Sequence, residues 1–363
     1  MSREVKALEL DPHMAIRREQ GGEAVWRDAC EKPLALSGFC WFEQDRLYRR
    51  LPLQPSVSIP ESVSSLANCT AGGTIRFRSD STAVFLRFEL SGGPVGMDHM
   101  PATGQCGFDL YLKSGAADRF CGVTRLNTKD RQYTARLFEA KTAELRDFTI
   151  HFPLYQGVVR VELGFDAGAR IEAPRDRRVP GRLLFYGTSI TQGGCASRPG
   201  MAYTNILSRR LDVETVNLGF SGNGRGEPEL ARLICEVDHL NAVVLDYEAN
   251  AGSTQMQTLP PFVDILRRHA LELPILVLSR IPFAPDLRDS ECYDRFRELA
   301  SKQREFVEER RKAGDRHIHF FDGLGLLPRA IADECTVDGV HATDLGFLHM
   351  AEALQPVLRG LLG

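Results

Sequence analysis

The sequence has no large excess of charge of either sign. Its 363 residues include 45 lysines and arginines against 48 aspartates and glutamates, which gives a formal net charge of −3. Proteins that bind nucleic acid by counterion release, or that dock on acidic membranes, concentrate basic residues. The balance therefore excludes a dominant electrostatic attraction to either partner.

Long apolar segments are also missing. The opening residues, MSREVKALELDPHM, contain no apolar run of signal-peptide length, and no other stretch approaches the roughly 20 apolar residues that a membrane span needs. We therefore expect a cytoplasmic protein without a membrane partner. The sequence leaves the oligomeric state open.

The nine cysteines form no recognisable set. They are odd in number and scattered, with no C-x-x-C and no Cys/His metal spacing, and the histidines lack ligand spacing as well. We expect free thiols in a reducing compartment, and neither a metal nor another cofactor. For Cys195 we expect packing rather than reactivity, because no neighbour in the sequence obviously lowers its pKa.

The chain is long enough for about two domains, and its two parts differ in pattern. Between about residues 34 and 165, short β-type runs such as AVFLRFEL and VVRVELGF alternate apolar and polar side chains, with Gly, Ser, Asn and Asp between them. This pattern predicts an antiparallel β-sandwich of jelly-roll type. The clearest strands are expected at residues 74–77, 83–90, 107–112, 148–152 and 158–163.

A proline- and arginine-containing stretch at residues 172–181 is a plausible linker, so we place an accessory domain at residues 1–175 and a second domain at residues 181–363. In the second domain, apolar strands alternate with helices, which predicts a parallel sheet covered on both faces. Strands are expected at residues 182–186, 214–218, 242–247, 274–279 and 317–321. Helices are expected at residues 202–211, 228–237, 261–270, 290–313 and 344–358, with Gly360 as the final stop.

A serine follows the first of these strands, in the turn Gly187-Thr188-Ser189-Ile190-Thr191-Gln192-Gly193-Gly194. A glycine-flanked turn from strand to helix exposes the serine hydroxyl beside backbone N–H groups, as a nucleophile needs. The spacing is neither G-x-S-x-G nor a phosphate loop. The plain alternative is that Ser189 caps the following helix.

Near the C-terminus, Asp338 lies three residues before His341, just ahead of the last helix. At this spacing the carboxylate can accept a hydrogen bond from one ring nitrogen and leave the other to face a nucleophile. The plain alternative is an aspartate that caps the helix beside an ordinary surface histidine.

Two further loops follow the second and third strands, NLGFSGNG at residues 217–224 and DYEANAG at residues 246–252. The Gly222 N–H and the Asn250 amide can join the Ser189 N–H as an oxyanion hole. The alternatives are a turn that needs a positive φ for the glycine and an Asx-turn for Asn250.

Taken in chain order, these four blocks resemble those of the SGNH (GDSL-like) hydrolase superfamily. The resemblance implies a flavodoxin-like parallel sheet, with Ser189 as nucleophile, His341 as base, Asp338 as its orienting partner, and Ser189, Gly222 and Asn250 as oxyanion donors. In the first half, Gly107-Phe108-Asp109-Leu110-Tyr111 looks like the Gly-x-Asp-Leu-Tyr signature of a β-sandwich fused to one SGNH branch.

The sequence departs from the GDSL pattern at Thr188, where Asp is usual, and in a third block that reads Glu-Ala-Asn-Ala rather than Gly-x-Asn-Asp. These departures argue against a lipase. The resemblance favours an esterase for short acyl groups, acetyl in particular, on an acylated sugar. We expect Arg198, Arg225 and His99 to contact the substrate.

Two rival interpretations remain open. The same residues can transfer a small acyl group to a sugar or natural-product hydroxyl. Alternatively, the protein binds carbohydrate without catalysis, on a degenerate SGNH scaffold.

Overall fold

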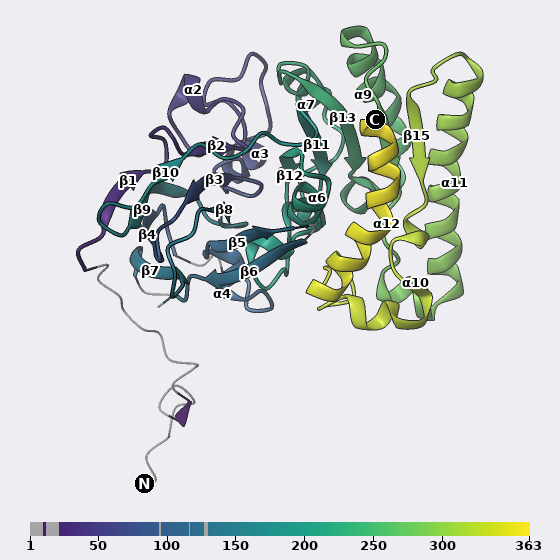
Figure 1. The fold of residues 1–363 in the computed structure, drawn as a ribbon. Coiled ribbons are helices and arrows are strands. Elements are labelled where there is room, and N and C mark those ends of the chain that lie inside the picture. Colours follow the sequence, from purple (N-terminus) through teal and green to yellow (C-terminus); the bar gives the residue numbers. More distant parts are fainter. Residues whose placement is uncertain (1–9, 12–21, 94–95, 116, 127–129) are drawn as a thin grey trace.

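The computed structural model describes residues 10–11, 22–93, 96–115, 117–126 and 130–363. Figure 1 shows a β-rich first half, coloured purple to blue, beside an α/β second half, coloured teal to yellow. In the part of the chain that is described, no helix is long and apolar enough to cross a membrane.

The first half is built from two antiparallel sheets. One has the strand order β1-β9-β4-β7, and the other has the order β10-β3-β8-β5-β6, with β2 paired to β3. The expected antiparallel sandwich is thereby confirmed. The strands are β1 (Val25–Asp28), β2 (Ala35–Ser37), β3 (Thr74–Ser79), β4 (Ala83–Leu90), β5 (Asp109–Ser114), β6 (Ala117–Val123), β7 (Gln132–Glu139), β8 (Arg146–His151), β9 (Val158–Phe165) and β10 (Ile171–Glu172).

Strict alternation of side chains explains why these sheets pack together. Along β4, every second residue is buried, beginning with Val84, as expected for a strand with one face on a core. Phe88 of β4 and Phe77 of β3 belong to one apolar cluster, together with Phe148 of β8. The two sheets therefore share a single core.

The second half contains a five-stranded, all-parallel sheet with the order β12-β11-β13-β14-β15. In chain order this is 2-1-3-4-5, the flavodoxin-like order that the resemblance implied. In open sheets of this kind, ligands generally bind beyond the carboxyl ends of the strands, at the point where the strand order reverses. The strands are β11 (Arg182–Gly187), β12 (Glu214–Gly219), β13 (Leu240–Asp246), β14 (Ile275–Leu278) and β15 (Ile318–Phe321).

Helices cover both faces of this sheet. Leu183 and Phe185 of β11 pack with α6 (Tyr203–Leu211) and α12 (Asp344–Leu362). Leu184 and Tyr186 point to the other face, against α7 (Pro228–Ile234), α9 (Gln255–His269) and α11 (Ser290–Lys312). The shorter helices include α2 (Phe42–Asp45), α3 (Glu61–Leu66), α4 (Ala102–Gln105), α10 (Ala284–Arg288), η2 (Gly252–Thr254), η3 (Gly323–Gly325) and η4 (Arg329–Cys335).

Two helix boundaries differ most from the expected ones. Helix α9 begins at Gln255 rather than at Pro261, because Gln255 and Leu259 are already buried. Helix α12 continues through Gly360 to Leu362. Gly360 does not stop it, because Leu361 and Leu362 pack against the same core as the rest of the helix.

Candidate active site

The serine turn begins where β11 ends. Thr188 is the N-cap of α5 (Ser189–Gln192): its hydroxyl accepts the Ile190 N–H, and its own N–H donates to the Thr191 hydroxyl. Ser189 is therefore the first helical residue rather than the cap, which removes the plain alternative for this serine. A side chain at Gly187 would clash with the Thr191 hydroxyl, so the tight turn needs a glycine there.

The serine hydroxyl meets a histidine and an aspartate. Ser189 Oγ lies 2.8 Å from His341 Nε2, and His341 Nδ1 lies 2.7 Å from Asp338 Oδ2. Because a carboxylate accepts hydrogen bonds, Nδ1 carries the proton and Nε2 offers its lone pair to Ser189. The structure thus brings together the three residues that the sequence singled out, from segments far apart in the chain.

Asp338 is held as an anion. Burial works to raise its pKa, but hydrogen bonds from the His341 N–H, the His341 ring and the Val340 N–H outweigh burial and lower the pKa to about 2. Asp338 does not cap α12, since Thr343 does so by accepting the Gly346 N–H. The carboxylate is therefore free to orient the imidazole.

The oxyanion-hole candidates lie in two linked loops. Gly222 is exposed with φ +68°, and nothing lies within 4 Å of where its side chain would be. Asn250, in α8 (Glu248–Ala251), donates through its amide to the Phe220 carbonyl at 3.3 Å. Within the described residues, no protein acceptor is recorded for the N–H of Ser189 or of Gly222. The N–H groups of Ser189 and Gly222 thus remain available to a developing negative charge.

Buried polar groups join the serine turn to the Gly222 loop. The Gln192 side chain accepts the Ser221 N–H at 3.1 Å and donates to the Leu154 carbonyl. Arg50, from the first half, is 1% exposed, and its guanidinium donates to carbonyls at the end of β12, including Gly219. Sequence reasoning missed Arg50, because no local pattern distinguishes it from a surface arginine.

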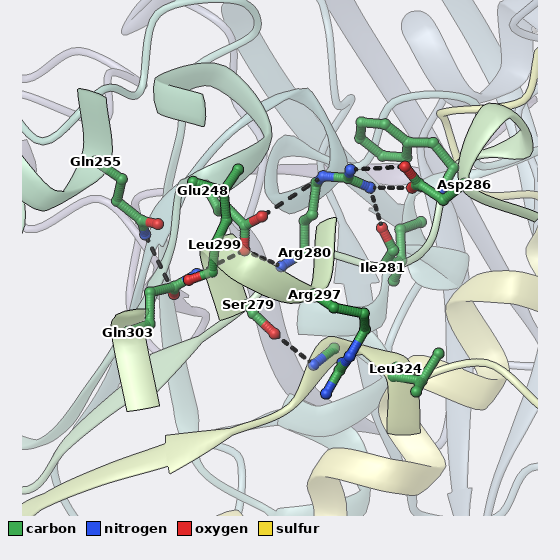
Figure 2. A network of polar contacts seen from close by, with 12 residues as sticks. Glu248, Gln255, Ser279, Arg280, Ile281, Asp286, Arg297, Leu299, Gln303 and Leu324 are labelled. Atoms are coloured by element: carbon green, nitrogen blue, oxygen red, sulfur yellow. Dashed lines mark hydrogen bonds and ion pairs between the residues drawn. The ribbon is translucent and has the colours of Figure 1, made fainter. Parts of the chain in front are cut away.

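A charged network supports Asn250 from behind. Figure 2 shows Arg280 between Glu248 and Asp286. The Glu248 carboxylate accepts the Arg280 N–H at 2.9 Å and the Gln303 amide at 2.7 Å, while the Arg280 guanidinium makes a bidentate pair with Asp286. Glu248 begins α8 and is 1% exposed, so the network fixes the helix that carries Asn250. The sequence analysis missed this network as well.

A second buried carboxylate lies behind the serine turn. Asp246, at the end of β13, accepts hydrogen bonds from the Thr191 hydroxyl at 2.9 Å and the Tyr203 hydroxyl at 2.7 Å. Burial raises the pKa of Asp246 to about 7, although both hydroxyls act in the opposite direction. The Asp246 carboxylate therefore contacts the Thr191 and Tyr203 hydroxyls and not the Ser189 hydroxyl.

The three residues expected to contact substrate have different surroundings. His99, from the first half, lies beside Asp338 and His341, with a ring nitrogen 3.8 Å from Asp338 Oδ2 and 43% of its side chain exposed. Arg225 is exposed next to the Gly222 loop. Arg198 instead donates to Asp109 at 3.0 Å and packs over the Phe120 ring, so its partners are protein groups.

Asp109 shows what the Gly-x-Asp-Leu-Tyr signature does. This fully buried carboxylate accepts the Gly200 N–H at 2.8 Å as well as the Arg198 guanidinium. Gly200 lies in η1 (Pro199–Met201), shortly after the serine turn. The signature of the first half thus anchors a segment of the second.

Comparisons with known proteins agree with this architecture. Residues 181–359 match the GDSL-like lipase/acylhydrolase family, and residues 24–171 match the GxDLY domain described as the N-terminus of SGNH-hydrolase-type esterases. The two matches together cover most of the chain. A search of curated proteins found no match.

Solved structures resemble the whole chain. A protein from Bacteroides ovatus ATCC 8483 assigned as a GDSL-like lipase is 26% identical over 93% of this chain and 98% of its own, with a TM-score of 0.83. A salicylyl-acyltransferase from a tetracycline biosynthetic pathway is 20% identical, with a TM-score of 0.75 over 95% of this chain and 98% of its own. A family two carbohydrate esterase from Cellvibrio japonicus is 14% identical, with a TM-score of 0.58 over 93% and 98%. The latter two share the fold.

The fold and these matches define an ester hydrolase of the GDSL-like class. More particularly, the chain belongs to the SGNH hydrolases that carry an N-terminal GxDLY domain.

Proposed function

We propose that the protein is a serine esterase that removes short acyl groups, acetyl above all, from a carbohydrate. The observation that carries this proposal is the hydrogen-bonded series Ser189–His341–Asp338, with contacts of 2.8 and 2.7 Å. In this arrangement a neutral imidazole takes the serine proton while a carboxylate holds its other nitrogen.

The reaction follows from these positions. Ser189 Oγ bonds to the acyl carbon as its proton passes to His341 Nε2, and Asp338 stabilises the imidazolium. The N–H groups of Ser189 and Gly222 and the amide of Asn250 bind the oxyanion. When the tetrahedral intermediate collapses, the bond to the sugar oxygen breaks, and His341 protonates that oxygen. Water then repeats the cycle on the acyl-serine and releases the acid.

Two observations support a carbohydrate ester as the substrate. The fold is shared with a carbohydrate esterase, and the serine block departs from the GDSL pattern in a way that argues against a lipase. We assign catalysis to residues 181–363 and an accessory role to residues 1–175. We assign His99 and Arg225 to contacts with the sugar, whereas Arg198 acts as a positioning residue, because Asp109 and Tyr111 hold it.

Acyl transfer is the second candidate, favoured by the fold shared with an acyltransferase. The acyl-serine intermediate is common to both reactions, and only the acceptor differs. Hydrolysis uses water, while transfer uses a sugar or natural-product hydroxyl.

The test compares the wild type with Ser189→Ala on p-nitrophenyl acetate and on acetylated cello-oligosaccharides. Ser208→Ala is the matched control, because this buried serine of α6 donates only to Val213, away from the triad. We expect S189A to lose several powers of ten in kcat and S208A to keep its activity. Equal rates in the wild type and folded S189A would contradict the proposal. Product analysis with an added acceptor alcohol separates hydrolysis from transfer.

A further inference from the structure

Three groups that can bind a metal converge beside the triad. His99, Cys195 and His341 each offer a ligand atom, and these atoms all lie within 4.8 Å of one another. They come from the loop before α4, the turn after α5 and the loop before α12. The sequence analysis expected no metal site because it looked for short spacings, and this set forms only in the folded chain.

The donor set is selective. Two imidazoles and a thiol suit Zn²⁺, whereas Mg²⁺ and Ca²⁺ prefer oxygen. On a tetrahedral zinc ion, neighbouring ligand atoms lie roughly 3.5 Å apart, so the set needs only a small inward movement. His99, with 43% of its side chain exposed, is the ligand that can make this movement and admit the ion.

The segments that carry the ligands are fixed to each other. The Gln105 amide donates to the Met97 and Met100 carbonyls and thus holds the His99 loop. The Thr103 hydroxyl donates to the Ser197 carbonyl at 2.6 Å, next to Cys195. The site is therefore largely preformed.

Cys195 itself is in an unusual position. It is 5% exposed and has φ +76°, in the left-handed region that favours glycine. A side chain that is kept in a strained backbone position beside an active site is a pointer to a role. Asp338 accepts a hydrogen bond from His341 Nδ1, as carboxylates commonly do from the free ring N–H of zinc-binding histidines.

We propose that His99, Cys195 and His341 bind Zn²⁺, and that bound zinc inhibits the esterase, a consequence that rests on the proposed function. On binding, the Cys195 S–H bond breaks, an S–Zn bond forms and the proton passes to solvent. His341 binds through the lone pair of Nε2, since Nδ1 holds its proton for Asp338. That lone pair is the one that accepts the Ser189 proton, so zinc binding and general-base catalysis exclude each other.

The test titrates the metal-stripped full chain with Co²⁺ and then displaces it with Zn²⁺. A thiolate-to-cobalt charge-transfer band at one equivalent is expected. Cys195→Ala should abolish the band, and His99→Asn should weaken binding at least tenfold. Cys292→Ala and His349→Asn are matched controls, because these half-buried residues lie on α11 and α12 outside the cluster, and both should bind like the wild type.

The second measurement compares p-nitrophenyl acetate hydrolysis with and without Zn²⁺. Zinc should slow the wild type at least tenfold, reversibly with a chelator, while the ratio in C195A stays near one. Absence of the thiolate band, or equal zinc affinity in C195A and the wild type, would overturn the site. Titration of S189A keeps the two proposals apart, because it reports the metal site without ester turnover. If zinc binds through Cys195 but the wild type hydrolyses no ester, the proposed function fails and the metal site stands.

Discussion

The two halves of the molecule contribute to the site in different ways. In the second half, separate segments beyond the strands of one parallel sheet carry Ser189, Gly222, Asn250 and His341, and the sheet edge sets their spacing. The first half supplies His99 from a loop and uses Asp109 to anchor the segment after the serine turn. The comparison teaches that one half holds the proposed reacting groups and the other holds their surroundings.

The largest effect is expected in the second half, which carries the proposed reacting groups. His341→Ala removes the proposed base, and kcat for p-nitrophenyl acetate should fall by about 10⁴ to 10⁶-fold. His349→Ala, on the following helix, is the control and should change kcat little. A loss smaller than tenfold in a folded H341A protein would mean that the reacting groups lie elsewhere.

A smaller effect is expected at the oxyanion hole. Asn250→Ala removes one proposed donor from α8, and kcat should fall by about 10² to 10³-fold while KM changes little, because the donor acts mainly on the transition state. Steady-state kinetics on p-nitrophenyl acetate measures both constants. An unchanged kcat would remove Asn250 from the mechanism.

A substitution in the first half should act on stability instead. Asp109→Ala leaves the Arg198 guanidinium and the Gly200 N–H without their buried acceptor, and the free energy of unfolding should fall by about 3 kcal/mol. Urea unfolding measures the loss, and kcat per folded molecule should change less than tenfold. Arg198→Ala added to D109A should cost less than it does alone. A large drop in kcat at unchanged stability would show that Asp109 acts in catalysis, which contradicts the supporting role proposed for the first half.

The smallest effect concerns pH. The pKa of Asp246 is raised from 3.8 to about 7 in the folded chain, so between these values the folded state binds more protons than the unfolded state. The free energy of unfolding contributed by Asp246 therefore falls as pH rises from about 4 to about 7, and is constant above. Asp246→Asn removes this dependence.

Urea unfolding of D246N and the wild type at pH 5 and pH 8 checks this sign. The stability of D246N relative to the wild type should improve by about 2 to 3 kcal/mol between the two pH values. If the difference between the two proteins stays constant, Asp246 does not titrate in this range. The free energy of unfolding would then contain no pH-dependent contribution from the carboxylate behind the serine turn.

The same comparison explains what the sequence could predict. The parallel sheet was readable because its strands are continuous apolar runs, and the serine and Asp-x-x-His blocks follow strand ends or precede a helix. In the sandwich, β1, β2, β6, β7 and β10 were not predicted. β6 is one example: it leaves Phe120 45% exposed and has no clean alternation to read.

Contacts between distant segments were beyond prediction for a different reason. Arg50, Arg280 and Asp109 each meet partners that only the fold brings near, so their local sequence carries no signal of burial. Arg198 was expected to meet substrate, and its pairing with Asp109 became visible only in three dimensions. The cluster of His99, Cys195 and His341 was also not predictable, because only the fold brings these three residues together.

The most direct test of the central claim is covalent labelling with a fluorophosphonate, followed by peptide mapping by mass spectrometry. An activated serine displaces fluoride and keeps the phosphonyl group, because its neighbouring base takes up the proton. The account predicts one label per chain, on Ser189, lost in H341A and unaffected by S208A. Labelling of a different residue, or rapid ester hydrolysis by a chain whose Ser189 is fully labelled, would contradict it.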